Sequence, residues 1–132
     1  MLAAVLVATA CNNGSATPAT SPTSPTTAPQ TTTQTFTGSL NPNGADTFTF
    51  AAQPGTVTAT LTSLGSGSTI DVGLSLGTFD GTSCTVGVAD DAAQVNTVVT
   101  GTASVGGNLC VRVYDVGNVT STLPFAITVV HQ

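Results

Sequence analysis

The sequence predicts an all-β domain, an antiparallel β-sandwich of the jelly-roll or immunoglobulin-like (Ig-like) type with about eight strands, preceded by a disordered stalk. Charged residues make up only 5% of the 132 residues, and Glu and Lys are absent. Thr and Val are frequent instead, and these β-branched residues fit the pleated surface of a sheet. From Gln34 onward, alternating apolar and polar residues are interrupted by turn residues at fairly regular spacing, which favours a sandwich over βαβ units.

The stretch 108–115 is expected to form a central strand. It contains the only arginine and the only tyrosine of the chain, Arg112 and Tyr114. Apolar side chains occupy every second position, as they do in a strand with one buried face. The inward face is expected to carry Leu109, Val111 and Val113, and the outward face Cys110, Arg112 and Tyr114.

Seven other stretches are expected to form strands, separated by recognisable turns. The pair Asn43 and Gly44 supplies the positive φ angles of a tight hairpin, and Pro54 with Gly55 fits the centre of a type II turn. Residues 90–93, Asp-Asp-Ala-Ala, are expected to form an acidic loop. The expected strands are residues 35–40, 46–51, 56–64, 70–76, 82–88, 95–104 and 123–130.

The N-terminus indicates export. Residues 1–10 form an apolar run that is too short to span a bilayer and resembles the hydrophobic region of a signal peptide. Because no basic residue precedes this run, we expect the true start codon to lie upstream. The sequence Val-Ala-Thr-Ala-Cys then resembles a bacterial lipobox, in which Cys11 is lipidated and anchors the protein to a membrane; ordinary signal cleavage after Ala10 is the alternative. Stable anchoring takes more than one acyl chain.

Residues 11–33 are expected to be a low-complexity linker. They are rich in Ser, Thr and Pro, and prolines recurring every three or four residues favour an extended, semi-rigid polyproline II spacer. The Ser/Thr cluster allows O-glycosylation, and an unmodified linker is the plainer interpretation. The expected organisation is a signal peptide at 1–10, a linker at 11–33 and a β-sandwich domain at 34–132.

The three cysteines are an odd number for a protein expected to be exported. Cys84 and Cys110 lie on different expected strands, and in an oxidising compartment the default is a disulfide between them. Cys11 then remains for the lipid. Two metal-binding thiolates are the alternative, but the only histidine, His131, is expected at the frayed C-terminal end. Because Cys110 alternates with inward residues, the bridge is expected to join neighbouring strands on an outer face.

With the strands placed, the domain resembles the bacterial pre-peptidase C-terminal (PPC) domain, a β-sandwich that accompanies secreted enzymes. The resemblance implies a binding or secretion-assisting role, with calcium stabilising some members, and no catalysis. The pair Leu109 and Cys110 departs from the family pattern, where an aromatic residue is usual. The segments that carry the resemblance are residues 36–40 with 46–50, 55–61, 71–76 and 107–114.

The aspartates are candidates for a calcium site, because hard cations take carboxylate and carbonyl oxygens from loops. No EF-hand spacing is present, and solvated loop carboxylates are the plainer interpretation. No other cofactor is expected. The candidate ligands are Asp46, Asp71, Asp90 and Asp91.

Catalysis is not expected from this sequence. Gly-Leu-Ser-Leu-Gly around Ser75 matches the G-x-S-x-G text of hydrolases, and Asp90 and His131 follow in the chain order of a triad. A nucleophile elbow needs a strand, a sharp turn and a helix, whereas Ser75 is expected in the middle of a strand. Because Glu and Lys are absent and His occurs once, other acid–base pairs are scarce.

The charge balance limits the partners. A net charge of −5 with a single cation argues against nucleic acid, whose binding requires neutralised phosphates. Arg112 is expected to pair with Asp115. Two classes of function remain: a non-catalytic binding module of the bacterial cell envelope that recognises an envelope protein or a polysaccharide, and a structural spacer or subunit with no discrete ligand. With no Trp and one Tyr to stack on sugars, a protein partner is favoured.

Overall fold

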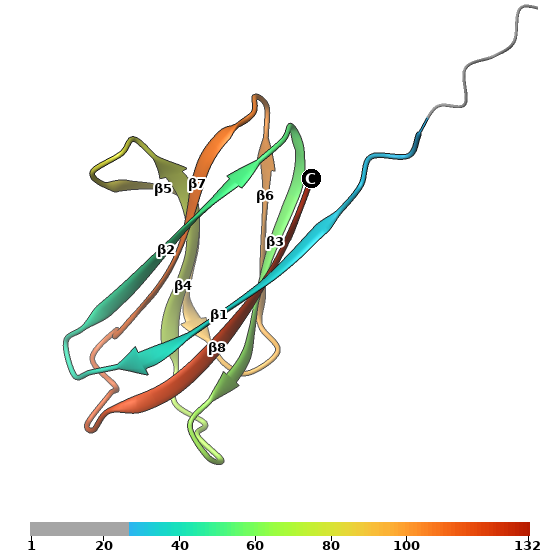
Figure 1. The fold of residues 1–132 in the computed structure, drawn as a ribbon. Coiled ribbons are helices and arrows are strands. Elements are labelled where there is room, and N and C mark those ends of the chain that lie inside the picture. The colour runs from blue at the N-terminus through green and yellow to red at the C-terminus, as the bar shows by residue number, and fades with distance from the viewer. Residues whose placement is uncertain (1–26) are drawn as a thin grey trace, which may run out of the picture.

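The computed structural model describes residues 27–132, which form a sandwich of two four-stranded antiparallel sheets (Figure 1). The predicted signal peptide, Cys11 and most of the predicted linker lie outside the described residues. Within residues 27–132, no helix is long and apolar enough to cross a membrane. The strands are β1 (Thr32–Leu40), β2 (Ala45–Ala52), β3 (Gly55–Leu64), β4 (Val72–Phe79), β5 (Cys84–Ala93), β6 (Val98–Ala103), β7 (Gly107–Tyr114) and β8 (Leu123–His131).

The strand order is that of a jelly roll. One sheet has the order β1-β8-β3-β6 and the other β2-β7-β4-β5. Each early strand pairs with its counterpart counted back from the C-terminus: β1 with β8, β2 with β7, β3 with β6 and β4 with β5. The chain therefore has the topology of one long antiparallel hairpin whose paired strands are distributed alternately over the two sheets. The predicted all-β sandwich of eight strands is confirmed, in its jelly-roll form.

The turn between β1 and β2 is not the hairpin that the Asn-Gly pair predicted. The Gly44 N–H donates to the Asn41 carbonyl at 2.9 Å, and Asn43 rather than Gly44 has a positive φ, of 56°. Because β1 pairs with β8 and β2 with β7, this turn carries the chain from one sheet to the other. The two strands face each other across the interior, where the rings of Phe36 and Phe48 stack with centroids 5.0 Å apart.

The core between the sheets is filled unevenly. Aromatic side chains occupy the side where β1, β2 and β8 meet, and Phe48 packs against both Phe36 and Phe125. On the opposite side, β5 and β6 contain no aromatic residue. The sheets are therefore held apart by large rings on one side only. The largest fully buried side chains of the core include Leu40, Leu61, Leu64, Leu74 and Ile127.

Strand β5 is longer than predicted and includes the segment expected to be an acidic loop. Asp90 pairs with Leu74 of β4, so the acidic segment is part of the sheet. The register shifts near Gly77 and again near Val72. Such bulges are common in edge strands and interrupt the alternation by which a strand is recognised in a sequence. This irregularity is why residues 89–93 were not predicted as a strand.

His131 is not at a frayed end, contrary to the prediction. It is the last residue of β8 and is 4% exposed. Its ring packs on Phe50 with centroids 5.0 Å apart, and its Nε2 lies 3.2 Å from Gln34 Oε1 on β1. Because β8 lies between β1 and β3 in the sheet, its last residues are held from both sides.

The predicted disulfide between Cys84 and Cys110 is present. The expectation that it joins neighbouring strands is wrong, because β4 lies between β5 and β7. Strands separated by a third strand normally lie about 9 to 10 Å apart, whereas the two Cα atoms of the bridge are 5.9 Å apart. The start of β5 therefore crosses over β4 to reach β7.

Reducing this disulfide should destabilise the domain. The bridge spans 26 residues, and a loop of that length corresponds to about 3 to 4 kcal/mol in the chain-entropy account. We expect the free energy of unfolding in urea to fall by this amount when dithiothreitol is added. A Cys84→Ala/Cys110→Ala variant, as the control, should not respond to dithiothreitol. A change below about 1 kcal/mol would mean that hydrogen bonds alone hold β5 in place.

Candidate functional site

The three outward residues of β7 each lie beside a small residue of β4. Because these β4 residues have short side chains or none, groups from β5 and β7 can contact each other across the outer face of β4. Two of the three positions on β4 are glycines. The pairs are Cys110 with Gly77, Arg112 with Ser75, and Tyr114 with Gly73.

The first link across β4 is at Gly77. A Cβ at this position would lie 2.1 Å from the Thr85 carbonyl oxygen, so only glycine lets the backbone of β5 pass so close. The crossing also covers Cys110, which is 0% exposed although it points away from the core. The disulfide then fixes the crossed strand to β7.

The second link is at Gly73. The Tyr114 ring lies across it, because a Cβ at Gly73 would be only 2.0 Å from the ring. The Tyr114 hydroxyl donates a hydrogen bond to Asp91 Oδ1 on β5. Desolvation and this hydrogen bond raise the pKa of Tyr114 to about 12. Strand β5 is thus tied to β7 at both ends of the outer face.

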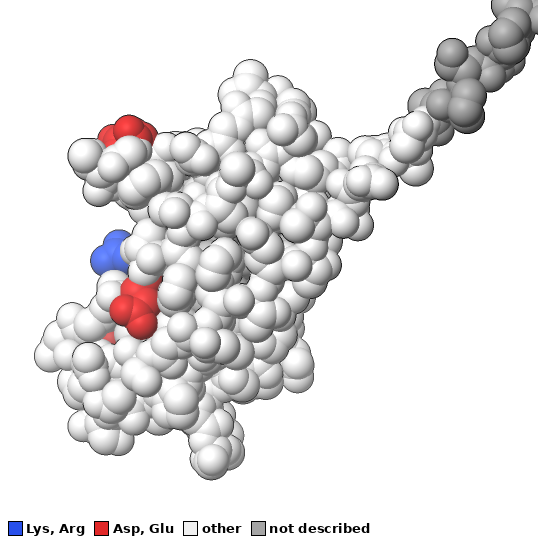
Figure 2. Space-filling model, in the orientation of Figure 1, with Lys and Arg blue, Asp and Glu red and all other residues white. Residues whose placement is uncertain are grey.

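Arg112 lies between the two links and has no carboxylate partner. All six aspartates belong to the described residues, and none lies within 4.0 Å of the guanidinium nitrogens. The Arg112 Cζ sits 5.4 Å from the centroid of the Tyr114 ring, in a cation–π contact. Figure 2 shows Arg112 as the one blue patch, reaching the surface between two red patches.

Ser75, beside Arg112, has unused hydrogen-bonding capacity. It is 0% exposed, and its Oγ has no hydrogen-bond partner in the described structure. An unpaired buried hydroxyl costs about 1 to 3 kcal/mol. The middle of the outer face therefore holds two polar groups, on adjacent strands, whose donors are not engaged.

Asp115 does not pair with Arg112, contrary to the prediction. Its carboxylate instead accepts main-chain N–H groups from the loop after β7 and from the turn between β1 and β2. These hydrogen bonds, that from Val119 first, lower the pKa of Asp115. The carboxylate therefore organises two loops. The donors are Asn43, Gly117, Asn118 and Val119, at 2.8 to 3.0 Å.

The predicted calcium ligands are not gathered into one site. Within residues 27–132, no group of three His, Cys, Asp or Glu residues could hold a metal ion. Asp71 instead accepts a hydrogen bond from Gln94 Nε2 at 2.6 Å. The four aspartates are spread across the sheet β2-β7-β4-β5, including both of its edges. Asp46 is on β2, Asp71 just before β4, and Asp90 and Asp91 on β5.

Ser75, Asp90 and His131 are not arranged as a triad. Ser75 lies in the middle of β4, which is followed by a short turn and β5 rather than by a helix. The ring nitrogens of His131 contact Gln34 and Gln132. The G-x-S-x-G text is thus part of a strand, as the sequence context indicated.

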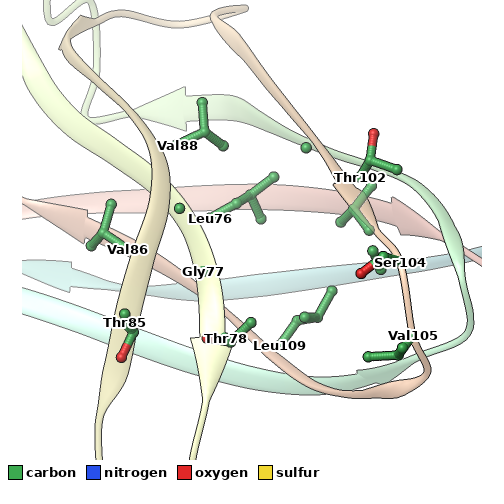
Figure 3. Close-up of a pocket in the computed structure, with 14 residues that line it drawn as sticks. Leu76, Gly77, Thr78, Thr85, Val86, Val88, Thr102, Ser104, Val105 and Leu109 are labelled. Atoms are coloured by element: carbon green, nitrogen blue, oxygen red, sulfur yellow. The ribbon is translucent and has the colours of Figure 1, made fainter.

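A groove of about 370 Å³ opens between β5 and β6, the outermost strands of the two sheets. Figure 3 shows residues of β5 on one side and of β6 on the other, with Leu76 and Leu109 between them. No charged residue lines the groove. Val86 and Val105, which also line it, are 47% and 73% exposed. This groove was not predicted from the sequence, because its lining comes from five strands that meet only in the folded protein.

Gly101 on β6 leaves this groove open. A Cβ there would make ordinary contacts, 3.6 Å from Val88 Cγ1 and 3.9 Å from Leu76 Cδ1. On the opposite side of the sandwich, the stacked rings of Phe36 and Phe48 fill the space between the edge strands. The only sequence signal for the groove was a glycine within a Val- and Thr-rich strand.

The raised pKa of Tyr114 can be measured directly, because the chain has a single tyrosine and no lysine. We expect phenolate absorbance to titrate near pH 12 in the folded protein. Since the folded pKa lies above the ordinary value, the stabilisation is complete below about pH 10 and is lost as the pH rises toward about 12. Thermal unfolding from pH 9 to 12 should show this loss, and a Tyr114→Phe variant should not.

Asp91→Asn should lower the Tyr114 pKa toward its ordinary value, because it removes the negative charge that opposes the phenolate. Asp71→Asn, which removes the same charge elsewhere, is the control and should leave the titration unchanged. Equal shifts in both variants would show that net charge, and not the contact with Asp91, sets this pKa.

Comparisons with known proteins add the fold but no family. No family model matches the chain, and no curated protein matches it. The crystal structure of the Yersinia pseudotuberculosis-derived mitogen is similar with a TM-score of 0.55 at 15% identity, covering 76% of this chain and 86% of that chain. The crystal structure of PliG from Aeromonas hydrophila, a periplasmic inhibitor of g-type lysozyme, reaches a TM-score of 0.48 at 14% identity, covering 74% and 83%. The first similarity supports the β-sandwich fold, and the resemblance to the PPC domain stays a prediction.

Proposed function

We propose that this chain is a non-catalytic, exported binding module of the cell envelope that holds an extended segment of another protein in the groove between β5 and β6. The observation that carries the proposal is an uncharged groove beside a free strand edge. An extended peptide can add to such an edge through main-chain hydrogen bonds and place alternate side chains in the groove.

Strand β6 is the better edge for this pairing. It pairs with β3 without a register shift, whereas the ladder between β5 and β4 shifts twice. A regular edge presents its free N–H and C=O groups at even spacing, and bulges disrupt that spacing. Val86 and Val105 would contact apolar side chains of the bound segment.

Export is supported by the disulfide, since such bonds persist in oxidising compartments. The apolar run before Cys11 supports a signal peptide, and the lipobox-like residues support a lipid anchor. The resemblance to the PPC domain implies the same non-catalytic binding role. A Ser/Thr/Pro-rich linker would hold the domain away from the membrane surface.

Filling the groove should abolish binding without unfolding the domain. Gly101→Val places a β-branched side chain against Val88 and Leu76, where there is room for its Cβ. We expect proteins retained from an envelope extract by the wild-type chain to be retained at least tenfold less by this variant. The melting temperature should not fall, because valine suits a strand.

Thr100→Val is the matched control. It adds an apolar surface of the same kind on the exposed, outward side of the same strand, so it should retain the same proteins as the wild type. Equal retention by Gly101→Val would refute groove binding. Retention of nothing by any variant would favour a structural spacer, and retention of a polysaccharide would replace the protein partner.

Lipidation of Cys11 can be tested in the producing bacterium. We expect a clickable fatty-acid analogue to label the wild-type chain and the protein to fractionate with membranes. A Cys11→Ser variant should be unlabelled, while Cys84→Ala/Cys110→Ala, which removes the other two cysteines, should still be labelled. A soluble, unlabelled wild-type protein would indicate ordinary signal cleavage.

A further inference from the structure

On the outer face, the three residue pairs of β7 and β4 mark three rows that run across the strands. The rows at Gly77 and Gly73 each contain a link from β5 to β7, whereas the middle row, at Ser75, contains none. At Gly77 the disulfide joins β5 to β7, and at Gly73 the Tyr114 hydroxyl reaches Asp91. Between these links the row is lined mostly by short side chains. It runs across the four strands as Thr47, Arg112, Ser75 and Ala89. The Arg112 guanidinium thus lies between the two links, and we call this part of the outer face, which is lined by Thr47, Arg112, Ser75 and Ala89, the bay.

The bay contains donors without acceptors. A guanidinium has five N–H donors in a planar fork, and no aspartate of the chain pairs with the one on Arg112. The Ser75 Oγ beside it also lacks a partner within residues 27–132, but Ser75 is 0% exposed, so the contact with a ligand is made by the guanidinium. The Arg112 guanidinium is half-buried and positively charged, so the group that complements it best is an acceptor with negative charge.

We propose that this bay binds one carboxylate, carried by an acidic side chain on a loop of a partner protein. A planar carboxylate matches the guanidinium fork and accepts two parallel hydrogen bonds. The site is distinct from the groove between β5 and β6, because it lies on the outer face of the sheet. It therefore adds a second, charge-dependent contact to whatever the groove holds.

The surroundings select a protein carboxylate over other anions. Asp90 and Asp91 are close enough to act on Tyr114 electrostatically, and they oppose any ligand with several negative charges. An acidic sugar would find no free aromatic face to stack on here, because the Tyr114 ring is already packed over Gly73. A single acidic residue on an otherwise neutral loop meets neither obstacle.

The single arginine gives a direct test by NMR. In the isotope-labelled full chain, Arg112 gives the only arginine Nε–H signal. We expect a saturable shift of this resonance on titration with the capped peptide acetyl-Gly-Asp-Gly-amide, together with shifts of the Ser75 and Ala89 amides. The neutral peptide acetyl-Gly-Asn-Gly-amide should cause no saturable shift.

Two variants and a matched control connect the shift to the guanidinium. Arg112→Lys keeps the charge but loses the planar fork, and should weaken binding about tenfold. Arg112→Gln should abolish the shifts at Ser75 and Ala89. Ser121→Asp gives the same net charge as Arg112→Gln but lies in the loop between β7 and β8, and should bind as the wild type does.

The same experiment can overturn the proposal. Equal responses to the Asp and Asn peptides, binding that survives in Arg112→Gln, or tighter binding of inorganic phosphate than of the Asp peptide would each refute it. A shift that depends on protein concentration without peptide would identify a second copy of the chain as the occupant instead. Gly101→Val should bind the Asp peptide normally, so a failure of the groove and a failure of the bay are distinguishable.

Discussion

The close approach of β5 to β4 at Gly77 is the constraint on which the outer face depends. Any side chain at this position would meet the Thr85 carbonyl. Because β5 can cross there, Cys84 reaches Cys110 although their strands are not neighbours. The crossing buries Cys110, the residue of β7 that forms the disulfide. The register shift near Gly77 gives β5 the bend that this crossing requires. The disulfide link beside Arg112 therefore depends on the absence of a Cβ at Gly77.

Patterns local to one strand were sufficient to predict the class of fold. Alternation placed Leu109, Val111 and Val113 on one face, and all three pack against or within the core. The cysteine count predicted the disulfide correctly. Alternation fails where an edge strand bulges, so Asp90 and Asp91 were expected in a loop. It also cannot tell which sheet a strand joins, and so the turn at Asn43 was mistaken for a hairpin.

The functional surfaces were harder to predict because they are built from several strands at once. Arg112 was recognised as the only cation, but its partner was expected to be Asp115, its near neighbour in the sequence. The Asp115 carboxylate instead accepts hydrogen bonds from four main-chain N–H groups, which two loops bring together in the folded protein. The groove depends on Gly101 facing Val88, a contact between different sheets that no sequence pattern records.

The way the acids are used explains why one cation can matter in so weakly charged a protein. Five of the six aspartates accept hydrogen bonds from main-chain or side-chain groups of the same chain. Those carboxylates stabilise turns and links through these hydrogen bonds. Arg112 has no carboxylate partner, so its positive charge is not neutralised at short range. Contacts in the uncharged groove depend on shape and main-chain hydrogen bonding, whereas a contact at Arg112 is weakened by salt. The two proposed surfaces would thus recognise a partner by different physical means.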